Sequence, residues 1–170
     1  MTNYLSLSPG NHSNLQVKPR WPYREVLICP EAFTRLQQAQ DRLGVTAQLV
    51  ITRAFEPGNF ILRRLHSLMR TIGAICFVMR YPQRSSEVPA IFSANGHDKD
   101  GTHVDIAIIH NGKLLRLLPR SVLTHATTIA AIEAKHSKLL EAVRTSLREV
   151  GFRIHSNQTE ALQIHCDLML

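Results

Sequence analysis

The sequence predicts a single α+β domain in which helices pack against a largely antiparallel central sheet. The chain has 170 residues, the size of one domain with one hydrophobic core. Its hydrophobic fraction of 44% and charged fraction of 19% are typical of a globular protein, and exclude a disordered chain or a coiled coil. The expected elements follow the order helix, strand, helix, strands, helix, strands, which indicates an α+β arrangement.

The N-terminal half is expected to hold a tail, two helices and one strand. Residues 1–24 contain three of the eight prolines and no periodic pattern, so we expect a tail or a surface strap there and the folded domain over residues 25–170. Pro30 begins a helix that ends at Gly44, and residues 48–53 form a short buried strand. A second helix begins after Asn59, and its apolar seam comprises Ile61, Leu65, Leu68, Ile72, Ile75 and Met79.

The C-terminal half is expected to hold most of the sheet. A polar loop over residues 94–101 precedes a strand, and the pair Asn111-Gly112 favours a tight hairpin turn. One long helix is expected over residues 128–150, with His136 in its apolar seam, and Gly151 ends it. The expected strands cover residues 89–93, 103–109, 114–118, 152–155 and 162–169.

Charge and composition restrict the possible partners. The net charge of +7 favours an anionic partner, but the basic residues are scattered and aromatic residues make up only 6%, so nucleic acid is not expected. No apolar stretch is long enough to span a bilayer, so integral membrane contact is not expected either. Since no secretory signal is visible, we expect a cytoplasmic protein or one exported by a non-classical route. The three cysteines, in separate apolar contexts, are expected to be free thiols.

Three residues form a candidate zinc site. His97 lies in the polar loop, Asp105 on the strand that follows it, and His165 on the last strand. Two imidazoles and one carboxylate can provide three zinc ligands and leave the fourth position for water, as a catalytic site requires. Strand alternation places His103 on the same face as Asp105, and Asp167 on the same face as His165. The alternative is that these are ordinary, partly exposed strand residues.

The residues around this site resemble a known family. The segment His97-Asp-Lys-Asp-Gly101-Thr-His-Val-Asp105-Ile106 is similar to the pattern His-x-x-Gly-x-Ala-x-Asp-[Ile/Leu] of the zinc metallopeptidases that share a fold with D-alanyl-D-alanine peptidases, lysostaphin-type enzymes and the hedgehog signalling domain. Gly151-Phe152, followed by Gln163-Ile-His165-Cys-Asp167, resembles the C-terminal end of that family. The resemblance extends over residues 25–170, although its specific motifs cover about two dozen residues.

The resemblance implies a fold, a cofactor and a substrate. It implies the hedgehog/D-Ala-D-Ala peptidase-like fold and a zinc-dependent peptidase that hydrolyses the peptide part of bacterial peptidoglycan. By this resemblance His97, Asp105 and His165 would be the metal ligands. Glu160 is the nearest carboxylate for the role of the catalytic base, and Arg53 is the candidate for the group that binds a substrate carboxylate. In such a mechanism zinc activates a water molecule while the carboxylate takes its proton.

Three departures from the family pattern leave alternatives open. Seven residues separate His97 from Asp105 where the family has six, which makes His103 a rival ligand. Glu56 stands where the family has an arginine, and Leu162 and Gln163 stand where it has a base or an orienting group. A non-catalytic metal-bearing binding module on the same fold is therefore the second hypothesis. The third is an unrelated basic α+β domain whose histidines are incidental.

Overall fold

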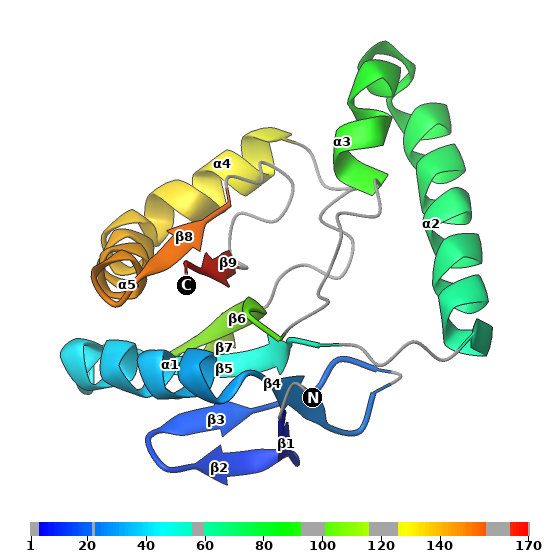
Figure 1. Ribbon diagram of the computed structural model, residues 1–170. Helices are drawn as coiled ribbons and strands as arrows, with labels where there is room; N and C mark the ends of the chain where they lie inside the picture. Colours follow the sequence, from blue (N-terminus) through cyan, green and yellow to red (C-terminus); the bar gives the residue numbers. More distant parts are fainter. Residues whose placement is uncertain are drawn as a thin grey trace.

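The chain folds into an α+β domain whose sheet is mostly antiparallel, as the sequence predicts (Figure 1). The computed structural model describes residues 4–21, 23–55, 60–92, 101–115, 126–155 and 164–169. The strands are β1 (Leu5–Leu7), β2 (Gly10–His12), β3 (Leu15–Val17), β4 (Val26–Ile28), β5 (Gln48–Arg53), β6 (His103–His110), β7 (Lys113–Leu115), β8 (Phe152–Ile154) and β9 (Ile164–Leu168). The helices are α1 (Pro30–Leu43), α2 (Phe60–Arg80), α3 (Val88–Phe92), α4 (Ala126–Lys135) and α5 (Ser137–Glu149), with a 3₁₀ segment η1 (Pro82–Glu87).

Strand β6 is the centre of the main sheet. The sheet has seven strands in the order β2-β3-β5-β6-β9-β8, and β7 also pairs with β6. Among the described strands, only the pairing of β3 with β5 is parallel. Asn111 and Gly112, both with positive φ, form the expected tight turn between β6 and β7. The long strand β6 thus pairs with β5 along one edge and with β9 and β7 along the other.

The N-terminal residues are part of the fold, so the predicted tail or strap over residues 1–24 is wrong. Residues 5–17 contain β1, β2 and β3, and β3 continues the main sheet beside β5. Leu15 and Val17 are buried in the same core as the other strands. These strands have three residues each, which is too short to show an alternation of apolar and polar residues between the prolines and polar residues of this segment.

Helices α1 and α5 cover one face of the sheet and enclose the core (Figure 1). Leu36 of α1 and Leu140 of α5 are fully buried there against Ile106 of β6. The two helices are also joined by a hydrogen bond that the Ser146 hydroxyl donates to the Ala39 carbonyl oxygen, at 2.7 Å. The hydrophobic core therefore lies between this face of the sheet and the two helices.

Gln40 connects α1 to the strand that follows it. This side chain is buried, and its Nε2 donates to the carbonyl oxygens of Ala47 (2.8 Å) and Gly44 (3.1 Å). Its Oε1 accepts a hydrogen bond from the Leu49 amide at 2.6 Å. One amide thus satisfies backbone groups on both sides of the turn, because buried backbone groups require partners.

Two expected elements differ from the structure. The long helix predicted over residues 128–150 is two helices, because His136 adopts φ −110° and ψ 12° between α4 and α5 and is not a core residue. The seam of α5 is buried in the core with α1, whereas Ile132 of α4 is only partly buried against that core. The strand predicted over residues 89–93 is wrong for residues 89–92, which lie in helix α3, whose Phe92 packs edge-on against Phe77 of α2. A local aromatic contact replaces sheet pairing there.

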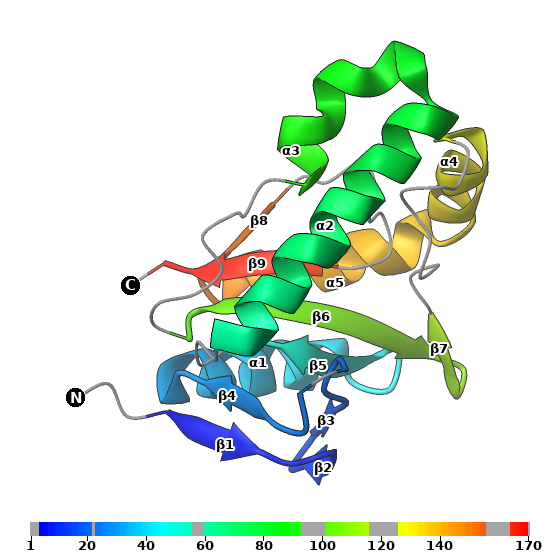
Figure 2. The ribbon, with the colours of Figure 1, turned by 90° about the vertical axis from the view of Figure 1, so that its right-hand side faces the viewer.

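Helix α2 lies on the opposite side of the sheet from α1 and α5 (Figures 1 and 2). Its predicted apolar seam is exposed where it is described, at Leu68, Ile72, Ile75 and Met79, while Phe77 is buried against Tyr81 and Phe92. Within the described part of the chain, none of the helices has the length and hydropathy to cross a membrane.

Candidate metal centre

Strands β6 and β9 bring a set of histidines and carboxylates together on the face of the sheet that is opposite to α1 and α5. In the antiparallel register Asp105 lies opposite His165, and His103 lies opposite Asp167. The intervening residues Val104 and Cys166 point to the other side, where both are fully buried in the core. The alternation predicted for these two strands is thus confirmed.

Asp105 is the most buried member of this set. Its side chain is fully buried, and its Oδ1 accepts a hydrogen bond from Nδ1 of His165 at 2.6 Å. The Nε2 atom of His103 lies 3.6 Å from the same oxygen. The ligand atoms of His103, Asp105 and His165 all lie within 4.8 Å of one another. These three side chains therefore converge on one small volume beneath the surface.

A tight backbone contact places the start of β6. The Cys29 amide, just before α1, donates to the Gly101 carbonyl oxygen at 3.0 Å, and the Leu168 amide donates to that of Thr102 at 3.1 Å. Gly101 has φ +72°, and a Cβ atom there would lie 2.7 Å from the Cys29 nitrogen. Only glycine fits this close approach without a shift of backbone. The contact fixes the position from which His103 and Asp105 follow.

The electrostatics of Asp105 favour its ionised form. Burial alone would raise its pKa, but the adjacent His103 ring, the hydrogen bond with His165 and the positive charge of Arg53 hold the pKa far below the ordinary value. Arg53 lies opposite Asp105 in the pairing of β5 with β6, next to a bulge in the register. Burial would also lower the pKa of His103, but the adjacent Asp105 and Asp167 carboxylates outweigh this effect and raise it.

One carboxylate oxygen provides a test of whether these residues fit a metal ion. Oδ2 of Asp105 is buried and has no hydrogen-bond partner among the described residues. A buried, ionised carboxylate oxygen without a partner is costly unless a cation or a donor satisfies it. Two imidazoles and one carboxylate are a common zinc ligand set, with ligand atoms about 3.3 Å apart when the metal is tetrahedral. The donor set and the lone oxygen both fit such an ion.

The residues predicted from the sequence are only partly brought together. Asp105 and His165 are in contact, and Arg53 lies beside Asp105. His97 and Glu160 lie outside the described residues. His103, the rival ligand, is the second histidine of the described cluster.

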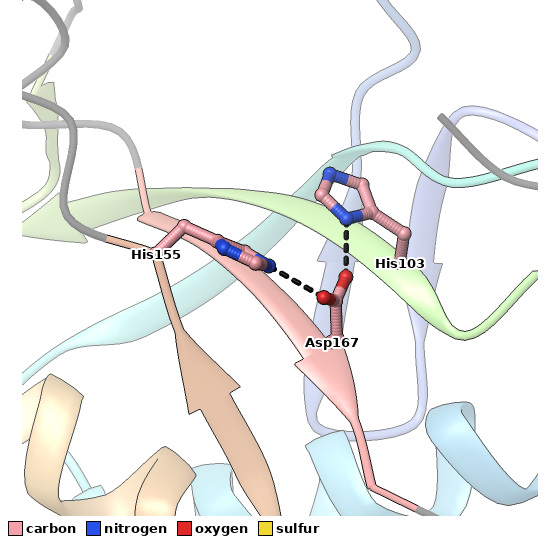
Figure 3. A group of neighbouring side chains, drawn as sticks. All are labelled: His103, His155 and Asp167. Carbon is pink, nitrogen blue, oxygen red and sulfur yellow. Dashed lines mark hydrogen bonds and ion pairs between the residues drawn. The ribbon is translucent and has the colours of Figure 1, made fainter. Parts of the chain in front are cut away.

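A second group adjoins the first and includes residues that were not among the predicted site residues. Figure 3 shows Asp167 between His103 and His155, with one carboxylate oxygen directed to each ring. Arg153 of β8 also contacts this carboxylate, with Nη2 3.1 Å from Oδ2. The sequence signal for Asp167 was its spacing of two from His165. The pairing of β8 with β9 brings His155 and Arg153 to this carboxylate.

Comparisons with known proteins assign no family. No protein-family model matches the chain, and no relative was found among the curated proteins.

Proposed function

We propose that this chain is a zinc-dependent peptidase with a hedgehog/D-Ala-D-Ala peptidase-like fold, and that its substrate is the peptide part of bacterial peptidoglycan. The observation that carries the proposal is the contact between Asp105 and His165, with a buried Asp105 oxygen that lacks a hydrogen-bond partner among the described residues. The motif resemblance names these same two residues as metal ligands. The class of substrate rests on that resemblance alone.

Asp105 and His165 would provide two of the zinc ligands. The third is His103, which the described cluster contains, or His97, which the motif indicates. Bound zinc supplies Lewis acidity, which lowers the pKa of a water molecule to about 7 and polarises a carbonyl group.

The remaining roles belong to groups around the metal ligands. Thr52 donates a hydrogen bond to the Asp105 carbonyl oxygen at 3.0 Å and so holds this part of β6 against β5. Arg53 is the basic residue beside the site, and we assign it to a substrate carboxylate. Glu160 remains the proposed base that takes the proton from water.

A non-catalytic metal-bearing binding module is the second candidate. It is favoured by Leu162 and Gln163, which occupy the positions where the family has a base or an orienting group. Of the acidic residues that the structure describes, Asp105 and Asp167 are the ones in the cluster, and both are engaged by histidines. In this case metal binding persists and hydrolysis is absent.

The test begins with zinc content and affinity, measured by elemental analysis and by competition with a chromogenic chelator. The parent is compared with Asp105→Asn, His165→Gln, His103→Gln and His97→Gln. His110→Gln is the matched control, because His110 is on the same strand but at its other end, where its ring bonds to the Thr46 carbonyl. We expect Asp105→Asn and His165→Gln each to weaken zinc binding at this site by about 100-fold or more, with the control unchanged.

The two histidine variants decide the third ligand, and a digestion assay decides the reaction. Whichever of His97→Gln and His103→Gln loses affinity at the Asp105–His165 site identifies the third ligand. Release of peptides from peptidoglycan by the parent, abolished in Asp105→Asn and in Glu160→Gln, supports the peptidase. Zinc binding without hydrolysis supports the binding module. If the parent binds no zinc, or if the loss of Asp105 or of His165 weakens none of the zinc binding that the parent shows, both proposals are wrong.

A further inference from the structure

Two groups of potential ligands, rather than one, occur on this face among the described residues. The first is His103, Asp105 and His165, and the second is His103, His155 and Asp167. In the second group the three ligand atoms also lie within 4.8 Å of one another. The groups share His103, whose Nε2 is near Asp105 and whose Nδ1 contacts Asp167. The two nitrogen atoms of one ring therefore face two different carboxylates.

The second group is built by the backbone of three strands. His103 begins β6, Asp167 lies opposite it on β9, and His155 follows β8. The His155 amide donates to the His165 carbonyl oxygen at 2.8 Å, which fixes the backbone of His155 beside β9. Its Nε2 lies 2.5 Å from Oδ2 of Asp167, and its ring centre is 5.7 Å from that of His103 (Figure 3). Sheet pairing, not a flexible loop, determines this convergence.

The two rings of the second group can hold either protons or a metal ion on the nitrogen atoms that face Asp167. As neutral N–H donors they hydrogen-bond the carboxylate, which the Arg153 guanidinium also contacts. In the other tautomers the same two nitrogen atoms carry lone pairs and can direct them at one divalent ion that the carboxylate also binds. Two nitrogen ligands and one oxygen ligand suit zinc and its neighbours rather than calcium or magnesium.

We propose that His103, His155 and Asp167 form a second binding site for a divalent transition-metal ion, zinc in the first instance, beside the Asp105–His165 site. The side-chain exposures are 16% for His103, 24% for Asp167 and 39% for His155, so the ion reaches the site from solvent. The proposal does not rest on peptidase activity, since it concerns different ligands and a binding measurement.

His103 imposes a condition on simultaneous occupancy. A neutral imidazole has one lone pair on nitrogen available for a metal, so it serves one ion unless it loses its remaining proton. Both sites are therefore filled together when the first takes its third ligand from elsewhere, or when His103 bridges as imidazolate. When neither holds, the two sites compete for His103. The test must accordingly remove the first site before it examines the second.

The experiment compares Asp105→Asn with the double variant Asp105→Asn/His155→Gln. Zinc stoichiometry and affinity are measured by isothermal titration and chelator competition, after circular dichroism has shown that each protein is folded. We expect Asp105→Asn to retain one zinc ion, and the double variant to bind it about 100-fold more weakly or not at all. The matched control is Asp105→Asn/His110→Gln, which should retain the ion. Equal affinity in Asp105→Asn and the double variant would overturn the proposal, as would loss of all zinc binding in folded Asp105→Asn.

A second comparison does not require the loss of Asp105. Because the Arg153 guanidinium, 60% exposed, competes for the Asp167 carboxylate, Arg153→Gln in the otherwise unchanged chain should strengthen zinc binding at the second site by about threefold.

If Asp105→Asn does not fold, His155→Gln alone is compared with the parent, because an exposed residue is replaced with little effect on folding. A loss of one zinc ion, or of affinity at one of two sites, supports the second site. Unchanged stoichiometry and affinity contradict it.

Discussion

Gly101→Ala is expected to damage both the stability of the fold and the proposed metal centre. Gly101 has φ +72°, immediately before the strand that carries His103 and Asp105. An alanine in this left-handed conformation costs about 1–2 kcal/mol. The new Cβ would also lie 2.7 Å from the Cys29 nitrogen and 3.1 Å from the Tyr4 ring.

The close contact adds a second cost to that of the backbone conformation. Since the obstructing atom belongs to the backbone, it is relieved only by separating residues 29 and 101, which lengthens or breaks the hydrogen bond from the Cys29 amide to the Gly101 carbonyl oxygen. A lost hydrogen bond of this kind costs about 1 kcal/mol. The total decrease in the free energy of unfolding is therefore about 2–3 kcal/mol. The displaced start of β6 should also weaken zinc binding by about tenfold, as changes next to metal ligands do.

Gly112→Ala provides the matched control. Gly112 has nearly the same φ, +71°, but a Cβ atom there would have nothing within 4 Å. This variant should lose only the conformational cost of about 1–2 kcal/mol and keep its affinity for zinc. Guanidinium unfolding followed by far-ultraviolet circular dichroism gives both free energies, and chelator competition gives the affinities. If the free energies of unfolding of the two variants fall by the same amount, within about 0.5 kcal/mol, the close approach of Gly101 to Cys29 adds no cost to the alanine substitution.

Three further predictions concern the core and the titratable groups. Gln40→Leu should lower the free energy of unfolding by about 2–4 kcal/mol, because it leaves the Leu49 amide without its buried acceptor; a loss below about 1 kcal/mol in chemical denaturation would contradict this. Leu140→Ala, at a fully buried side chain, should cost about 2–5 kcal/mol in the same assay, and a cost near zero would show that α5 does not pack as described. In the metal-free protein the pKa of Asp105 is lowered, so its contribution to stability, present above the ordinary value of 3.8, is lost as the pH falls. The pKa of His103 is raised, so its contribution is complete below 6.5 and is lost as the pH rises through the folded value. The denaturation midpoint should therefore fall toward both acid and alkaline pH, and His103→Gln should remove part of the alkaline fall; a parent profile without that fall would contradict the raised pKa.

The sequence predicts well those elements that a short-range pattern defines. Helix α1 begins at Pro30 and ends before Gly44, as expected, because proline suits a first turn and glycine accepts the positive φ that follows the last one. The turn at Asn111-Gly112 is confirmed for the same reason. The break at His136 was missed, because the apolar pattern of the sequence continues across it.

The candidate site shows the same division. Alternation along a strand is a local property, so the sequence by itself determined that His103 shares a face with Asp105, and His165 with Asp167. The register between the strands depends on contacts between residues about sixty positions apart, and only the tertiary structure decided that Asp105 faces His165 and that His103 faces Asp167. It also brought His155 and Arg153 to the Asp167 carboxylate through the pairing of β8 with β9. Which ligands can share one ion is a question of distances between strands, and a linear pattern carries no such distances.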